Sequence, residues 1–239
     1  MKNRLKKIIT EVAAVILLLL LIVSCQKEDT DTVTDFDGNV YKTISAGGNI
    51  WMAENLRTTK FRDGTAIPMV TGASEWAALS TYAYCWPENN ASNKGTFGGL
   101  YNGYAVLESR GLCPTGWHIP SDAEWIDLEL ELGLPQAEAY LDAIRGESQN
   151  VGGKLRATTN WEAPNLGANN SSGFSAYGTG YRRPPGEFTE YKAWTGYLTT
   201  TPATTQGNYW MRYLGYTIQG IDRHERDRQY GYSVRCVKD

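Results

Sequence analysis

The chain has 239 residues, of which 41% are hydrophobic, so it can fill the core of one large or two small domains. Its 23 basic and 26 acidic residues provide no basic excess, and we therefore expect no nucleic-acid partner. Two histidines and four cysteines leave few ligands for a metal cluster, and we expect no metal and no other cofactor.

Residues 1–24 have the pattern of a bacterial lipoprotein signal peptide. Four basic residues lie between positions 2 and 7, and an apolar run spans residues 12–23. The run is shorter than the roughly 20 residues of a membrane span, so with its basic start it indicates a secretory signal. The following Leu21-Ile22-Val23-Ser24-Cys25 resembles a lipobox, where the chain is cut before a lipidated cysteine. We predict lipid attachment at Cys25; a plain signal peptide, or an anchor with an unrelated cysteine, is the alternative.

Residues 25–35 are predicted to form an acidic, polar tether between the lipid and the folded domain. Within it, Gln26-Lys27-Glu28-Asp29 resembles the signal that sends lipoproteins of Bacteroidetes-type bacteria to the outer cell surface. We expect an outer-membrane lipoprotein, exposed at the surface, that contacts the membrane through its N-terminal lipid; retention facing the periplasm is the alternative. Removal of residues 1–24 takes away four basic residues and one acidic residue, which leaves a net charge of −6 and favours solubility.

The first elements of the domain are predicted to be strands. Residues 40–44 alternate in hydrophobicity, Gly47-Gly48-Asn49 forms a turn, and residues 50–52 begin a second strand, which together predict a β-hairpin. Ser74 is expected to cap a short helix that follows it. A further helix is predicted over residues 101–109, since a glycine suited to end a helix comes shortly after that segment.

The clearest helix signal begins at Ser121. This residue and Glu124 form the pattern of a capping box, with the serine at the N-cap and the glutamate three residues later. Glu129 and Glu131 are expected on the polar surface of the helix. Its apolar face carries Trp125, Leu128 and Leu132.

The pattern changes in the second half of the chain. A second helix is predicted between Pro135 and Gly146. Residues 153–239 then show no helical period, and nine of the 15 tyrosines lie between positions 177 and 232, which predicts short aromatic strands and long loops. The charge run 222–228 is expected to be a solvated hairpin loop before a last strand over residues 232–237. The apolar residues expected to be buried by the second helix are Tyr140, Leu141 and Ile144.

The pattern as a whole predicts one α+β domain over residues 36–239, with two or three helices, short antiparallel strands and long loops. No long repeat and no Ser- or Pro-rich linker divides this range.

Three cysteines remain once Cys25 is lipidated, and export places them in an oxidising compartment, so one disulfide and one leftover thiol are expected. The predicted pair is Cys113 and Cys236, which would join the last strand to the first main helix. In the loop-entropy model this closure stabilises the fold by about 4–5 kcal/mol. Cys85 is then the leftover thiol. Three reduced, buried cysteines are the alternative.

Several segments of the domain are distinctive in sequence. They are Trp51-Met52-Ala53-Glu54-Asn55-Leu56-Arg57, Cys113-Pro114-Thr115-Gly116-Trp117-His118-Ile119-Pro120, Gly152-Gly153-Lys154-Leu155, Ser172-Gly173-Phe174-Ser175-Ala176 and Ser233-Val234-Arg235-Cys236-Val237. In order and spread these segments resemble the Fibrobacter succinogenes major paralogous domain, FISUMP, over residues 36–239. The resemblance implies a C-type-lectin-like fold, in which the terminal strands meet and a disulfide links the first helix region to the last strand. It also implies a lipoprotein or surface protein with a binding or adhesion role.

Departures from related proteins argue against two activities. Calcium-dependent lectins carry an acidic ligand before a proline, whereas Ala163-Pro164-Asn165 lacks it, so no calcium site is predicted. Formylglycine-generating enzymes use active-site cysteines on a related fold, and no close cysteine pair lies near the end of this chain. His118 has no recognisable nucleophile or carboxylate partner in the sequence and is expected to be a structural hydrogen-bonding residue. No catalytic residue is therefore predicted.

The remaining functional candidates are aromatic and basic side chains in the second half of the domain. Flat apolar rings beside Asn, Thr, Gly and Arg suit sugars or extended peptides. We predict a non-enzymatic binding or adhesion module that contacts a glycan or a surface protein. The alternatives are rings packed in the core, an enzyme on a formylglycine-generating-enzyme-like fold, and a structural subunit of a surface assembly. The candidate ligand-binding residues are Trp161, Tyr181, Arg182, Trp194, Tyr197, Tyr209 and Trp210.

Overall fold

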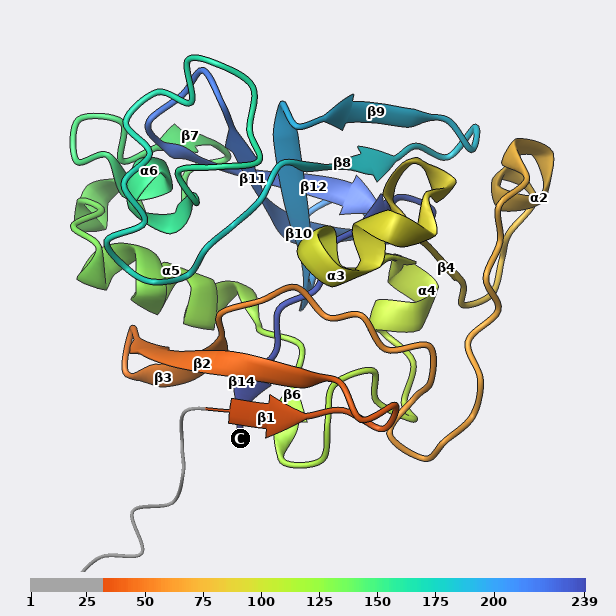
Figure 1. Cartoon of the computed structure of the whole chain (residues 1–239). Helices are drawn as coiled ribbons and strands as arrows, with labels where there is room; N and C mark the ends of the chain where they lie inside the picture. Colours follow the sequence, from red (N-terminus) through yellow and green to blue (C-terminus); the bar gives the residue numbers. More distant parts are fainter. Residues whose placement is uncertain (1–31) are drawn as a thin grey trace, which may run out of the picture. The chain divides into compact units, whose positions relative to one another are not determined.

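The computed structural model describes residues 32–239 (Figure 1). The expected signal peptide, Cys25 and the acidic segment 26–29 lie outside the described residues. The first described strand, β1 (Thr32–Thr34), pairs antiparallel with β2 (Val40–Ala46) and lies in the range for which the sequence predicted a tether.

The predicted hairpin at Gly47 is present. Strand β2 turns into β3 (Asn49–Met52), and the two strands pair antiparallel. Gly47 and Gly48 both have positive φ, at +62° and +72°, a conformation that costs glycine little. A Cβ atom on Gly47 would also lie 2.4 Å from the backbone nitrogen of Leu128, so this turn approaches the main helix closely.

Strands from both ends of the described chain form the smaller sheet. Its order is β1-β2-β3-β14-β6, where β14 is Val237–Lys238 and β6 is Trp117–His118. Val237 pairs antiparallel with Trp51 on one side and with His118 on the other. The predicted disulfide between Cys113 and Cys236 is confirmed, and it joins β14 to the segment before β6.

The larger sheet has nine strands and forms the upper part of the view in Figure 1. The pair β8–β10 is parallel, and the other pairs are antiparallel. Strand β9 (Phe188–Tyr191) pairs with β8 beside the main path. The order along that path is β4 (Tyr84–Cys85), β5 (Leu100–Asn102), β13 (Gly231–Tyr232), β8 (Thr179–Arg182), β10 (Trp194–Pro202), β11 (Asn208–Gly215), β12 (Ile221–Asp227) and β7 (Ala143–Arg145).

Among residues 32–239 the helices are short, and the longest has ten residues. This helix, α5, is the one predicted from the capping box. Ser121 Oγ accepts a hydrogen bond from the Glu124 backbone N–H, and Glu124 accepts one from the Ser121 N–H. The helices and 3₁₀ turns are α2 (Ala73–Ala77), η1 (Pro87–Asn89), η2 (Ala91–Asn93), α3 (Lys94–Phe97), α4 (Gly103–Val106), α5 (Asp122–Glu131), η3 (Gln136–Glu138) and α6 (Val151–Leu155).

The predicted α+β fold of C-type-lectin-like type is wrong. The described residues form 14 strands in two sheets with few short helices, an arrangement closer to a β-sandwich. The helix predicted over residues 101–109 shrinks to α4, because the preceding residues pair as β5 with β4 and β13. Asn102 then caps α4 by accepting a hydrogen bond from the Ala105 N–H. The predicted cap at Ser74 is also displaced, since Gly72 is the N-cap of α2.

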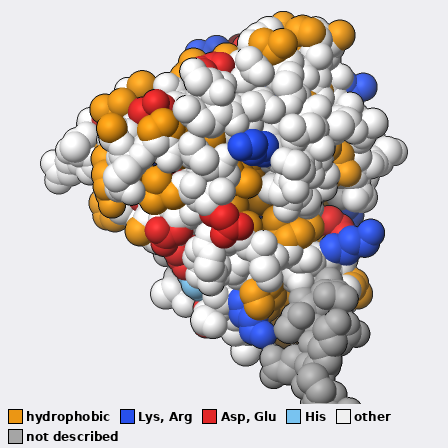
Figure 2. Space-filling view, turned by 90° about the vertical axis from the view of Figure 1, so that its left-hand side faces the viewer, with side chains coloured by type: hydrophobic (Ala, Val, Ile, Leu, Met, Phe, Trp, Pro, Cys, Tyr) orange, Lys and Arg blue, Asp and Glu red, His pale blue; other side chains and the backbone are white. Residues whose placement is uncertain are grey.

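The second predicted helix, between Pro135 and Gly146, is also wrong. The segment forms η3 and then the edge strand β7, which pairs with β12. Tyr140 and Leu141, expected to be buried, are 68% and 51% exposed, and Ile144 is exposed as well. Figure 2 views the molecule from the side on which α5, α6 and β7 lie in Figure 1, and apolar side chains reach the surface there.

Helix α5 packs between the two sheets. Trp125 is fully buried, and its ring centroid lies 5.1 Å from that of Trp51 in β3 and 5.4 Å from that of Tyr197 in β10. Leu128 and Leu214 complete this contact in the same core cluster. The apolar face predicted for the helix therefore joins the smaller sheet to the larger one.

A buried charge network fixes the polar side of α5 to the larger sheet. Arg212 Nη1 lies 2.7 Å from Asp122 Oδ1, and Arg145 Nη2 lies 2.8 Å from Glu129 Oε2. Arg223 Nη2 lies 2.8 Å from Asp122 Oδ2. Glu129 is fully buried, so its predicted place on the helix surface is wrong. The charge run predicted as a loop is strand β12, because Arg223 points inward to this network.

Candidate functional site

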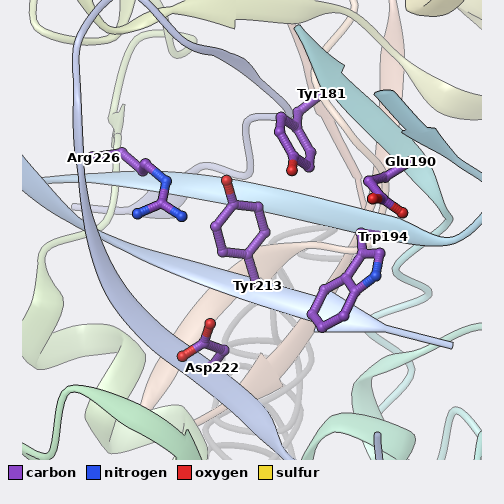
Figure 3. Close-up of a pocket in the computed structure, with 6 residues that line it drawn as sticks. All are labelled: Tyr181, Glu190, Trp194, Tyr213, Asp222 and Arg226. Atoms are coloured by element: carbon purple, nitrogen blue, oxygen red, sulfur yellow. The ribbon is translucent and has the colours of Figure 1, made fainter. Parts of the chain in front are cut away.

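Five neighbouring strands, β8 to β12, supply the walls of a pocket of about 270 Å³ (Figure 3). Tyr213 of β11 stands in the middle of the view. Trp194, Glu190 and Tyr181 lie to one side of it, and Asp222 and Arg226 to the other. The residues that line the pocket are Tyr181, Glu190, Trp194, Tyr213, Asp222 and Arg226.

The pocket has an aromatic wall. The ring centroids of Tyr181 and Tyr213 are 5.4 Å apart, and those of Trp194 and Tyr213 are 6.3 Å apart with nearly perpendicular planes. The Tyr213 hydroxyl shares a hydrogen bond with the Tyr232 hydroxyl. Burial raises the pKa of Tyr213 well above its usual value, so the phenol is neutral over the physiological range. The rings are thus held by one another and by the core.

A glycine makes room for the indole of Trp194. In the β10–β11 pairing, Trp194 stands opposite Gly215. A Cβ atom on Gly215 would lie 2.8 Å from the Trp194 ring, closer than real Cβ contacts allow. The absence of a side chain at Gly215 therefore fixes the position of the indole at the pocket.

The polar groups of the pocket come from β9 and β12. Asp222 is partly buried, and burial raises the pKa of its carboxyl, with Asp142 acting in the same direction and His224 and Arg226 opposing. Arg226 donates a hydrogen bond from Nη1 to the Glu225 carbonyl, while its buried Nε has no partner within residues 32–239.

The two carboxylates of the pocket are unpaired within the described part of the chain. The side chains of Glu190 and Asp222 form no hydrogen bond and no ion pair with any residue between 32 and 239. Glu190 is exposed and Asp222 is partly buried, so water solvates both carboxylates, and a ligand in the pocket can replace that water as a hydrogen-bond donor.

A family model described as the Fibrobacter succinogenes major domain matches residues 44–238, which include the whole pocket. The chain belongs to this family. No curated protein and no solved structure matches it. Family membership thus agrees with the resemblance found in the sequence, although the C-type-lectin-like fold that it implied does not hold.

Of the seven predicted ligand-binding residues, Tyr181 and Trp194 line the pocket of this family member. Arg182 follows Tyr181 in β8 and points to the opposite side of the strand, as alternation requires. It is fully buried and donates hydrogen bonds to the carbonyls of Val70, Thr71, Gly72 and Gly186. Arg182 therefore holds the loop before α2 against β8.

The other four lie elsewhere. Tyr197 is buried between Trp125 and other core rings, and its hydroxyl donates a hydrogen bond to Asn55 Oδ1. Trp161 donates a hydrogen bond from Nε1 to the Ala176 carbonyl. Tyr209 and Trp210 lie in β11. Tyr209 packs against the core. The guanidinium carbon of Arg223 lies over Trp210, 3.3 Å from the centroid of the Trp210 ring.

Sequence reasoning missed four of the six pocket residues: Glu190, Tyr213, Asp222 and Arg226. Within the charge run, Asp222 and Arg226 are four residues apart, which places them on one face of a strand. That spacing was the available signal, but the run lacks the apolar residues that mark a strand. Glu190 and Tyr213 carried no local signal of their own.

His118 has the structural hydrogen-bonding role that the sequence predicted. Its Nδ1 lies 2.7 Å from Asp239 Oδ1 and its Nε2 lies 2.8 Å from Glu124 Oε1. Both nitrogens are thus held by carboxylates. Cys85 is a free, buried thiol, and burial raises its pKa to about 12, which makes the reactive thiolate scarce.

Two features are absent from residues 32–239. No group of three or more His, Cys, Asp or Glu side chains in this range is placed to hold a metal ion. No helix in the same range is long and apolar enough to span a membrane.

Proposed function

We propose that this member of the family is a surface-exposed lipoprotein of the bacterial outer membrane that binds a sugar residue in the pocket formed by strands β8 to β12. The observation that carries the sugar proposal is the aromatic wall beside unpaired polar groups. The ring faces of Tyr181 and Trp194 suit the C–H faces of a pyranose. Carboxylates accept hydrogen bonds from its hydroxyls, and the guanidinium of Arg226 supplies donors at the same pocket.

The size of the pocket supports a single sugar residue. Its volume of about 270 Å³ is near the lower end of the range for small-molecule pockets, which begins at roughly 300 Å³. A terminal or side-branch residue of a glycan fits this space better than a long chain. An enzyme on a formylglycine-generating-enzyme-like fold loses its basis, because it rested on the fold that the described strands contradict.

Binding is tested by calorimetric titration of the full-length protein in detergent with a set of methyl glycosides. Trp194→Ala and Gly215→Ala should each lower the affinity at least tenfold, about 1.4 kcal/mol, since the first removes the ring and the second displaces it. Trp161→Ala is the matched control, because this partly exposed tryptophan lies outside the pocket. Equal losses in all three variants, or binding to no glycoside, would refute the sugar site.

The anchor is tested separately. Replacement of Cys25 by serine removes the thiol that the lipobox pattern assigns to the lipid. The variant should pass from the membrane fraction to the soluble fraction, and intact-mass measurement should show the loss of the acyl groups. Proteolysis of whole cells should degrade the native protein if it is exposed at the surface. A native protein without acyl groups would contradict the proposed anchor.

A further inference from the structure

The charges that line the pocket do not cancel. Glu190 and Asp222 carry two carboxylates, and Arg226 carries one guanidinium. The guanidinium is partly engaged already, because its Nη1 donates to the Glu225 carbonyl and its central carbon lies 5.6 Å from the Tyr213 ring centroid. With both carboxylates ionised, the side chains that line the pocket carry one excess negative charge.

The backbone at Glu190 is a second, independent feature. This residue has a φ of +61°, in the left-handed region that glycine and asparagine adopt more easily. Its carbonyl accepts a hydrogen bond from the Ala193 N–H in the turn between β9 and β10. Glycine would serve this turn at lower cost, yet the position holds a glutamate whose carboxylate lines the pocket and has no partner within residues 32–239.

Three aromatic rings complete the arrangement. Tyr181, Trp194 and Tyr213 surround the same space that the two carboxylates border (Figure 3). A cation is attracted both by the electron-rich faces of such rings and by nearby carboxylates, and both attractions are stronger than those of a neutral hydroxyl at the same place. The net charge of −6 left after removal of residues 1–24 also favours the approach of cations.

We infer that the pocket takes a ligand that bears a protonated amine, namely an amino sugar. The amine lies against the aromatic wall and between the carboxylates of Glu190 and Asp222, and the ring hydroxyls are left for Arg226. This inference rests on the proposed function, since the sugar ring is part of the ligand.

The amine also couples binding to pH. An ammonium group favours the ionised form of Asp222, so the affinity for the amino sugar should fall as the pH decreases and this carboxyl takes up a proton. The charged and titratable groups that act on Asp222 or face it across the pocket are His224, Asp142, Arg226, Arg145, Glu190, Tyr181 and Tyr213.

The inference is tested by calorimetric titration of the full-length protein in detergent with three methyl glycosides. These carry a free amine, an acetylated amine or a hydroxyl at the same carbon, as in glucosamine, N-acetylglucosamine and glucose. The free amine should bind about tenfold more tightly than the other two at neutral pH. Glu190→Gln and Asp222→Asn should each reduce this preference. Glu187→Gln, which removes an exposed carboxylate outside the pocket, should leave it unchanged.

The outcomes separate this inference from the proposed function. Equal binding of the three glycosides overturns the amine preference and leaves the sugar site standing. Binding of butylamine but of no glycoside, lost in Glu190→Gln, supports the cation site and overturns the sugar proposal. No binding of any of the four probes overturns both.

Discussion

At the scale of single residues, His118 joins β6 to the first turn of α5 and to the last residue of the described chain. Its imidazole lies between the carboxylates of Glu124 and Asp239. Partial burial alone would lower the pKa of His118, but the two carboxylates outweigh it and raise the pKa above its usual 6.5. The pKa of Glu124 is lowered, because its hydrogen bonds from Ser121 and His118 outweigh its burial.

These shifts predict a pH window for the contribution of His118 to stability. A raised histidine pKa stabilises the fold fully below about pH 6.5, and this contribution is lost as the pH rises through the folded-state value. The lowered pKa of Glu124 stabilises the fold above about pH 4.5, and this contribution is lost as the pH falls through the folded-state pKa. Because the ring is more than one-third exposed, solvent screening keeps the effect small.

The measurement is urea unfolding of the wild type and His118→Gln at pH values from 4 to 9. The difference in unfolding free energy between the two should be largest between about pH 4.5 and 6.5 and should shrink at higher pH. A difference that stays constant across this range would mean that the charge of the ring does not contribute.

The sequence predicted two residues of the candidate site, Tyr181 and Trp194, because partly exposed aromatic residues in a polar segment are recognisable locally. It could not predict Asp222, since an aspartate in a charge run carries the same local signal in a loop and in a strand. Only the pairing of β12 with β11 places Asp222 beside Tyr213.

At the scale of elements, α5 and β7 show where sequence patterns succeed and fail. The start of α5 is encoded locally by Ser121 and Glu124, so the prediction held. Strand β7 is set by its distant partner β12, and the helical spacing of Tyr140 and Ile144 competes with that pairing only weakly. Local periodicity cannot weigh a partner that lies about 80 residues further along the chain.

This contrast gives a matched pair of substitutions. Leu128→Ala in α5 should lower the unfolding free energy by about 2–5 kcal/mol, because the side chain is fully buried between the sheets. Leu141→Ala should change it by no more than about 0.5 kcal/mol, because this leucine is exposed.

Chemical denaturation of both variants under the same conditions measures the difference. A large loss in Leu141→Ala would indicate that the segment before β7 is buried, as the sequence pattern suggested. A small loss in Leu128→Ala would contradict the packing of α5 between the sheets.

At the scale of the whole molecule, residues far apart in the chain close the fold. The disulfide joins Cys113 and Cys236 across 123 residues, and both half-cystines lie in the core cluster. The fold class could not be predicted from the sequence, because many of the strands that pair in the sheets lie far apart in the chain. Most strands of the larger sheet are short, and their stability comes from neighbours along the sheet rather than from their own composition.

Removal of this disulfide should destabilise the protein by about 2–5 kcal/mol. We expect the double variant Cys113→Ala, Cys236→Ala to unfold at a lower urea concentration than the oxidised wild type. Dithiothreitol should move the wild type toward the variant and leave the variant unchanged. A wild type that does not respond to the reductant, or in which all three cysteines after Cys25 are alkylated without reduction, would show that the bond is not formed.

We propose the pocket formed by β8 to β12 as the ligand site of the molecule. The most direct measurement is an NMR titration of the full-length protein in micelles, which follows the indole N–H signals of its tryptophans as methyl glucosaminide is added. We predict a saturable shift of the Trp194 signal, assigned with Trp194→Phe, while the signals of Trp161 and Trp210 stay in place. A shift of Trp161 or Trp210 with Trp194 unchanged would contradict the account.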